Sequence, residues 1–223
     1  MKSLAVMMLV SMSSYFDSFP QESQFAIDFT TENKVEISKI KVYHSSEDAR
    51  LAMCIVAPEI SRYSRVANAA ETFALKTLYV QGKVSDFSIG IFQMKPSFAV
   101  SVENEVERCN YLKKFRNLII HEETERAVRF ERVERLSSLN WQLVYLCAFI
   151  EIARAKTLGI TFANTEEKLK YWATLYNGGL HSSESKIISL YEVEGFPKFS
   201  FNSFNYADVC VEFYRNIKYC SFL

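Results

Sequence analysis

A glutamate that follows an apolar run is the first residue whose chemistry the sequence suggests. Glu59 comes directly after the run CIVAP at 54–58, so its carboxyl is expected to lie among apolar groups. Such burial disfavours the ionised form and raises the pKa of a carboxyl group. A carboxylic acid that keeps its proton can protonate a poor leaving group, such as a glycosidic oxygen. Glu59 is therefore the candidate general acid; the alternative is a surface glutamate that caps a helix end.

A second candidate segment, residues 88–94 (SIGIFQM), lies in a stretch at 83–95 that lacks helical periodicity. Gln93 carries a side-chain amide, which both donates and accepts hydrogen bonds, as an N-acetyl sugar requires. Gly90 allows a chain or a ligand to approach the backbone closely. Plainer explanations remain, because a loop glutamine can bond nearby backbone and a turn often needs a glycine.

A third candidate segment, Tyr176-Asn177-Gly178-Gly179, closes a helical pattern late in the chain. Tyr176 offers a hydroxyl to a ligand, and its alternative is packing in the core beside Trp172. An asparagine followed by glycine is also an ordinary end of a helix. The presence of all three segments in one chain favours a functional site.

In this order, the three segments resemble the catalytic glutamate, the Gly-Leu-Met-Gln segment and the Ala-Tyr-Asn-Gly-Gly segment of the lytic transglycosylase and goose-type lysozyme superfamily. A fourth segment, 139–146 (LNWQLVYL), is similar to the asparagine and tyrosine-leucine signature on that family's central helix. The resemblance spans residues 45–180. It implies a lysozyme-like helical domain that cleaves the MurNAc–GlcNAc β-1,4 bond of peptidoglycan. It also implies catalysis by Glu59, glycan binding by Ser88, Gly90, Gln93, Met94, Tyr176 and Asn177, and contact between the Tyr176 hydroxyl and the catalytic carboxyl.

Two chemical outcomes stay open at this point. By resemblance to lytic transglycosylases, Glu59 would act as acid and then base while the 6-hydroxyl of muramic acid attacks C1, leaving a 1,6-anhydro end. A hydrolytic muramidase would need a group that orients water, and Asp86 is the candidate second carboxylate. Glu71 is also near in sequence, but it is expected to cap a helix.

A departure from the family supports a rival interpretation. In that family a serine follows the acid directly, whereas here Ile60 stands between Glu59 and Ser61. A non-catalytic peptidoglycan-binding or envelope-scaffold protein with a lysozyme-like fold is therefore an alternative. A third possibility is an unrelated helical protein in which the four matches are accidental.

Helices must position these candidates, and the patterns predict a mainly α fold with a little irregular or β structure near 83–95. Residues 14–44 are expected to form an N-terminal arm, extended or strand-like where Phe25, Ile27 and Phe29 alternate. Residues 45–223 are expected to form one lysozyme-like domain, with a bend or stop at Pro58. The expected helices cover 45–58, 68–82, 96–117, 122–136, 138–158, 164–179, 183–193 and 206–217.

Two of these helices have distinct expected roles. The segment 138–158 is the most apolar and should form the core helix. The segment 122–136 alternates in charge, with acidic and basic residues four apart, and is expected to be a solvated face without chemistry.

Composition excludes several classes of protein. The chain has 223 residues, 49% of them apolar, with six Gly and four Pro. Average usage would give about sixteen Gly, so a turn-rich β-sandwich or a disordered chain is disfavoured. Because 26 Lys and Arg balance 26 Asp and Glu, we expect no general binding to nucleic acid or anionic membrane.

The remaining signals concern location and metals. Residues 1–13 predict a secretory signal and export to the periplasm or cell envelope, and the alternative is a buried helix start. The apolar run there is too short for a stable membrane span. Five cysteines without C-x-x-C spacing and three scattered histidines indicate no metal site and no cofactor, although Cys210 and Cys220 could pair after export.

Overall fold

The computed structural model describes residues 14–66, 69–84, 86–197, 200 and 202–223. The expected secretory signal at 1–13 lies outside these residues. The fold is mainly helical, with 69% of residues in helices, as the sequence predicts. The described residues of the expected irregular stretch before Pro96 contain one β-bridge, between Ile89 and Met94.

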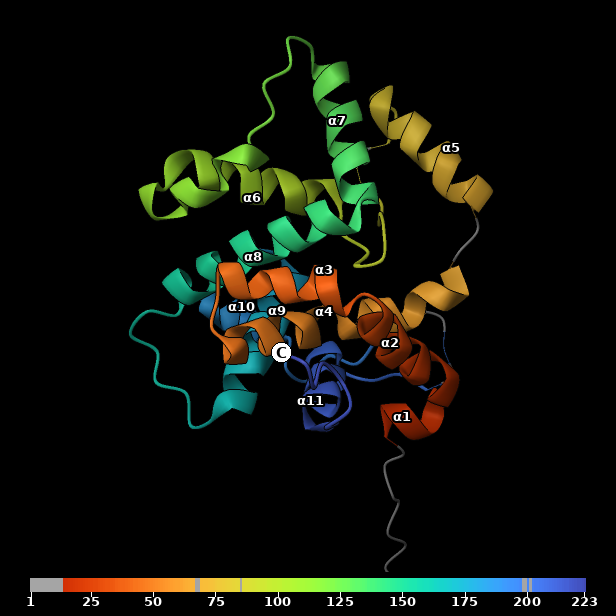
Figure 1. The fold of residues 1–223 in the computed structure, drawn as a ribbon, viewed down its shortest axis with the longest axis vertical. Helices are drawn as coiled ribbons and strands as arrows, with labels where there is room; N and C mark the ends of the chain where they lie inside the picture. Colours follow the sequence, from red (N-terminus) through yellow and green to blue (C-terminus); the bar gives the residue numbers. More distant parts are fainter. Residues whose placement is uncertain (1–13, 67–68, 85, 198–199, 201) are drawn as a thin grey trace, which may run out of the picture.

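Eleven α-helices and two 3-10 helices make up the described part of the chain (Figure 1). In order they are α1 (Tyr15–Ser18), α2 (Pro20–Glu32), α3 (Lys34–Ser38), η1 (Lys39–Val42), α4 (Ser46–Val66), α5 (Ala69–Val80), α6 (Pro96–Arg108), η2 (Asn110–Leu118), α7 (Glu125–Ser137), α8 (Leu139–Lys156), α9 (Thr165–Gly178), α10 (Glu184–Ser189) and α11 (Tyr206–Arg215).

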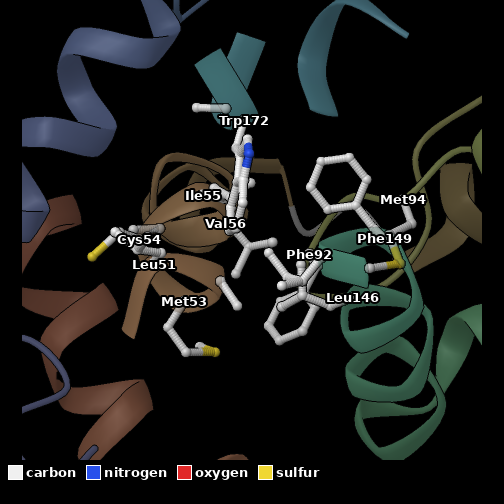
Figure 2. Close-up of a cluster of buried hydrophobic side chains, with 14 of the residues drawn as sticks. Leu51, Met53, Cys54, Ile55, Val56, Phe92, Met94, Leu146, Phe149 and Trp172 are labelled. Carbon is white, nitrogen blue, oxygen red and sulfur yellow. The ribbon is translucent and has the colours of Figure 1, made fainter. Parts of the chain in front are cut away.

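Helix α8 is the core helix that the sequence predicts. It runs through the middle of the molecule, with α6 and α7 on one side and α4 and α9 on the other (Figure 1). Leu146 and Phe149 of α8 are fully buried and gather with Phe92, Met94 and the α4 residue Val56 (Figure 2). This core fixes both α4 and the 88–94 segment relative to α8.

No single helix in the described part of the chain is both long and apolar enough to cross a bilayer. Helices α7 and α8 are long and apolar enough only when they are taken together, and the chain bends by 96° between them.

The helix that carries Glu59 does not stop at Pro58, because α4 continues to Val66. A proline inside a helix removes one main-chain donor and disturbs the preceding turn. A residue of α11 forms a hydrogen bond to that turn: the Tyr206 hydroxyl donates to the carbonyl of Ile55 at 2.8 Å. Glu59 therefore lies within a continuous helix that α11 supports from outside.

The N-terminal segment is not an extended arm or a strand, so that prediction was wrong. Phe25, Ile27 and Phe29 lie in α2, which packs against α4. The alternation of Phe25, Ile27 and Phe29 was misleading. The buried residues of α2 are one, three or four positions apart, which is the spacing of one face of a helix. They are Glu22, Ser23, Ala26, Ile27 and Thr30.

The chain's first described helix is also tied to its last. The main-chain N–H of Tyr15 lies 3.0 Å from the Oε2 atom of Glu212 in α11. Residues 14–44 are thus part of the packed structure, alongside the domain expected at 45–223.

Helix α7 is only partly the solvated face that the charge pattern predicts. The pairs Glu125–Arg129 and Glu131–Arg135 form, at 2.5 and 2.8 Å. Arg132, however, is buried, and its Nη2 atom lies 2.6 Å from Oε2 of the buried Glu103 in α6.

Two tyrosines complete this buried ionic cluster. The Tyr145 hydroxyl of α8 donates to Oε1 of Glu103 at 2.6 Å, and Arg132 Nη1 donates to the hydroxyl of Tyr79 in α5 at 3.1 Å. Burial alone would lower the pKa of Arg132, but the Glu103 carboxylate raises it overall. The cluster joins α5, α6, α7 and α8.

A buried histidine packs between η1, α4 and α8. The Nε2 atom of His44 lies 2.9 Å from the carbonyl oxygen of Cys147, and its Nδ1 atom lies 3.5 Å from Oε1 of Glu151. Burial lowers the pKa of His44 below its ordinary value of 6.5 and outweighs the opposing effects of the Cys147 carbonyl and Glu151. Arg154 and Lys114, which both pair with Glu151, lower it further.

Stability is therefore expected to fall as the pH drops below about 6.5, because the unfolded chain then binds a proton that folded His44 resists. This loss of stability continues as the pH falls, until the pH reaches the pKa of His44 in the folded protein. His44→Gln keeps a donor for the Cys147 carbonyl, so its melting temperature should change less between pH 7 and pH 5 than that of the wild type. Thermal unfolding monitored by circular dichroism measures both slopes, and equal slopes would contradict the prediction.

All five cysteines are free in the structure. The expected option of a Cys210–Cys220 bridge is therefore not realised. Both side chains are buried, and burial raises the pKa of each thiol. They fill space in the core around α4 and α11.

Candidate functional site

A cavity of about 340 Å³ opens beside Glu59. Its lining includes six of the residues that the sequence singles out, although they come from three segments far apart in the chain. These are Glu59, Ser88, Gln93, Met94, Tyr176 and Asn177. Helices α4 and α9 and the loop before α6 thus converge on one space.

The glutamate lies at the border between core and cavity. The residues on either side of it in α4, Pro58 and Ile60, are buried, whereas Glu59 is partly exposed. Its Oε2 atom is shielded from solvent. A carboxyl with one shielded oxygen and an opening to a cavity is suited to exchange a proton with a bound ligand.

Gln93 lies at a tight turn beside the cavity. Its backbone is left-handed, with φ of 48°, and its side-chain Nε2 donates to the Gly90 carbonyl at 2.8 Å. The local bond foreseen as the plainer alternative is therefore present. It orients the amide, and the side-chain oxygen is the atom that remains to accept a hydrogen bond from a ligand.

Gly90 was expected to bind the glycan, but it is not among the residues that line the cavity. Its φ is +70°, and a Cβ atom there would overlap the Gln142 amide and the Leu136 carbonyl oxygen. Gln142 is buried in α8, donates to the Ile89 carbonyl at 2.8 Å and accepts from Phe92 N–H at 3.3 Å. Gly90 thus lets the loop that carries Gln93 lie directly against α8.

Gly90→Ala should therefore destabilise the protein by about 2 kcal/mol or more, from backbone strain and from the displaced Gln142. Gly159→Ala is the matched control, since Gly159 also has a positive φ but a Cβ there meets no atom within 4 Å. We expect it to cost only about 1 kcal/mol. Urea unfolding of both variants measures the difference, and equal losses would show that the contact with α8 is unimportant.

The hydroxyls of half-buried Tyr176 and buried Tyr206 lie near the charge of Glu59. Burial raises the pKa of Tyr176 and of Tyr206, and the Glu59 carboxylate raises both further. The Tyr176 hydroxyl donates to the carbonyl of Phe92 at 3.0 Å, so the expected contact with the catalytic carboxyl is replaced by a main-chain acceptor. Its ring stacks edge-on with Phe98 at 5.0 Å. Tyr176 thereby joins α9 to the loop before α6 as well as lining the cavity.

Asp86, the candidate second carboxylate, is not among the residues that line the cavity. It accepts hydrogen bonds from Ser97 N–H at 3.1 Å and from Ser97 Oγ at 2.9 Å, and so caps the N-terminus of α6. Its Oδ2 atom also lies 3.9 Å from Lys95 Nζ. The other acidic candidate, Glu71, was expected to pair with Asn68, which lies outside the described residues.

Several lining residues were not predicted. Arg62 stands one helical turn after Glu59, so helical spacing alone could have placed it on the same face. Lys95 directly follows Met94. An apolar wall comes from the 193–206 segment, where no motif marks it; its members are Val193, Gly195, Phe196, Phe204 and Tyr206.

No protein-family model matches the chain, and neither a curated protein nor a solved structure matches it at a significant level.

Proposed function

We propose that the protein cleaves the glycan strands of peptidoglycan at the MurNAc–GlcNAc β-1,4 bond, with Glu59 as the general acid and base. The observation that carries this proposal is the convergence of Glu59, Gln93 and Tyr176 on one cavity. These residues belong to the three segments that resemble lytic transglycosylases and goose-type lysozymes. The export expected from residues 1–13, which would bring the enzyme to its substrate, is part of this proposal.

The lining suits a sugar chain. Glycans present polar edges and apolar faces, and the cavity lining contains both polar groups and aromatic side chains. Gln93 and Asn177 supply amides, and Phe98, Phe196 and Phe204 supply apolar surface. Glu59 lines the same cavity, where it can protonate the leaving oxygen of a bound glycan.

Formation of a 1,6-anhydro product is the preferred outcome. Hydrolysis needs a second group to orient the attacking water, and the candidate for it, Asp86, is engaged at the N-terminus of α6. Intramolecular attack by the 6-hydroxyl needs only one carboxyl, which gives up its proton to the leaving oxygen and then takes the proton of the 6-hydroxyl.

Purified protein incubated with cell-wall sacculi tests this function. We expect soluble muropeptides whose reducing ends are lighter by one water than hydrolysed ends, as measured by mass spectrometry. Reducing ends with the mass of hydrolysed ends would support glycan cleavage but contradict the 1,6-anhydro mechanism. Absence of any soluble product would reject the enzyme.

One observation favours a second candidate, a peptidoglycan-binding protein without catalytic turnover. Ser61 is fully buried, donates to the Pro58 carbonyl at 2.7 Å and lies 2.7 Å from the Tyr15 hydroxyl. It does not line the cavity, so the serine that follows the acid in the resembling family has no counterpart there. Retention on insoluble peptidoglycan without release of product, together with weaker retention of Gln93→Ala, would support this candidate.

A further inference from the structure

Two cations line the cavity beside Glu59. Arg62 lies three residues after Glu59 on α4, and Lys95 lies at the start of α6. With Glu59 ionised, these three charges sum to one positive charge. When Glu59 carries the proton that a general acid needs, two positive charges remain and no negative one.

Arg62 differs from most buried or half-buried cations of this protein. Arg132, Arg135 and Lys168 each pair with a carboxylate at 2.8 Å or less. Among the residues that the structure describes, Arg62 has no ion-pair partner, although it is half-buried. A guanidinium held in a cavity offers two parallel donors to a carboxylate, an arrangement that is stronger than a neutral hydrogen bond.

Lys95 adds a second, more exposed charge. Its side chain is 55% exposed, and its pairing with Asp86 is long, at 3.9 Å. Because solvent weakens that pair, the ammonium group remains able to attract a ligand. Arg62 comes from α4 and Lys95 from the N-terminal end of α6, and both line one cavity, so both positive charges attract an anionic group that binds there.

We propose that Arg62 and Lys95 make the cavity selective for glycans that carry a carboxylate next to the cleaved bond. This inference rests on the proposed function, and it names the chemical feature of the substrate that this chain recognises. In peptidoglycan such a carboxylate belongs either to the lactyl ether of muramic acid or to the peptide stem attached there. A neutral glycan of the same length lacks the group and leaves both cations without an anion.

The test measures binding rather than cleavage, using the full chain with Glu59→Gln so that no probe is consumed. The probes are three GlcNAc–MurNAc tetrasaccharides, which carry free lactyl carboxylates, lactyl carboxamides, or lactyl groups amidated with L-Ala-D-Glu. By calorimetry, we expect the carboxamide to bind about tenfold more weakly than the better of the two anionic probes. Which anionic probe binds better distinguishes the lactyl from the stem carboxylate.

Substitution then locates the selectivity. Adding Arg62→Gln and Lys95→Gln should reduce the tenfold preference to about threefold or less, with carboxamide binding unchanged. Arg126→Gln together with Arg116→Gln removes the same two positive charges from exposed positions and should leave the preference intact. Equal binding of the three probes, or a preference that survives both substitutions, would overturn the inference.

The outcomes also separate this inference from the proposed function. Wild-type protein that cleaves sacculi but shows no preference would refute the inference alone. A preference for anionic probes without cleavage would refute catalysis and leave the selectivity standing. If none of the three probes binds, both the inference and the proposed function are refuted.

Discussion

Glu59→Gln should reduce the release of muropeptides from sacculi by at least about a hundredfold, the lower range for loss of a general acid. The amide has the shape of the carboxyl but cannot deliver a proton, so the bond to the leaving oxygen is not assisted. Because Glu59 is partly exposed at the cavity, the substitution should leave the fold intact. Initial rates of release, measured by liquid chromatography, check the prediction.

Asp86→Asn is the matched control for that experiment. Asp86 is a carboxylate in the neighbouring loop, but it caps α6 and is not among the residues that line the cavity. Asparagine is nearly as good a cap, so the rate should stay within about threefold of the wild type. A loss comparable to that of Glu59→Gln would restore Asp86 as the group that activates water. Full activity of Glu59→Gln would remove Glu59 from the chemistry.

Arg132→Met is expected to produce the largest loss of stability, about 3 to 5 kcal/mol in the free energy of unfolding. The substitution leaves the Glu103 carboxylate buried without its cation, and the Tyr79 hydroxyl loses the donor on Arg132. Urea unfolding followed by tryptophan fluorescence measures the change. Arg129→Met, on the more exposed face of the same helix, should cost no more than about 1 kcal/mol.

Removing both charges separates the cost of an orphaned ion from the value of the pair. The double variant Arg132→Met with Glu103→Leu should recover part of the loss, because it leaves no buried charge, although the Tyr145 and Tyr79 hydroxyls lose their partners. If the double variant is as unstable as Arg132→Met alone, the buried ion pair itself supplies the stability. Failure of Arg132→Met to destabilise the protein would show that water reaches Glu103.

Local patterns predict the helices of this protein well where the signals are contained in one segment. The Asn164 side chain accepts from Glu167 N–H at 2.9 Å, as the capping pattern at the start of α9 predicts. Pro96 occupies the first turn of α6, and the apolar stripe at 138–158 becomes the core helix. Each of these depends on residues within a few positions of one another.

Other features depend on partners that no local pattern reveals. The charge alternation around Arg132 is that of an exposed helix, and only α6 and α8, brought close by the fold, make it a buried cation. Gly90 lies in a segment that resembles a ligand-binding motif. Its role is to allow close packing against Gln142 of α8, which is distant in sequence. For the candidate site, motif order led to Glu59, Gln93 and Tyr176, which line one cavity, whereas the aromatic residues at 193–206 have no recognisable signature.

The contact between Tyr206 and Ile55 joins residues 151 positions apart, and that between Tyr15 and Glu212 spans 197. Closing such long loops is slow, so contacts of this kind form late in folding. Tyr206, the α11 residue that lines the cavity, therefore reaches its place after α4 has formed. A chain that grows from its N-terminus carries Glu59 well before Tyr206 exists, so the complete cavity, and any cleavage that depends on it, arises only after Tyr206 has been synthesised.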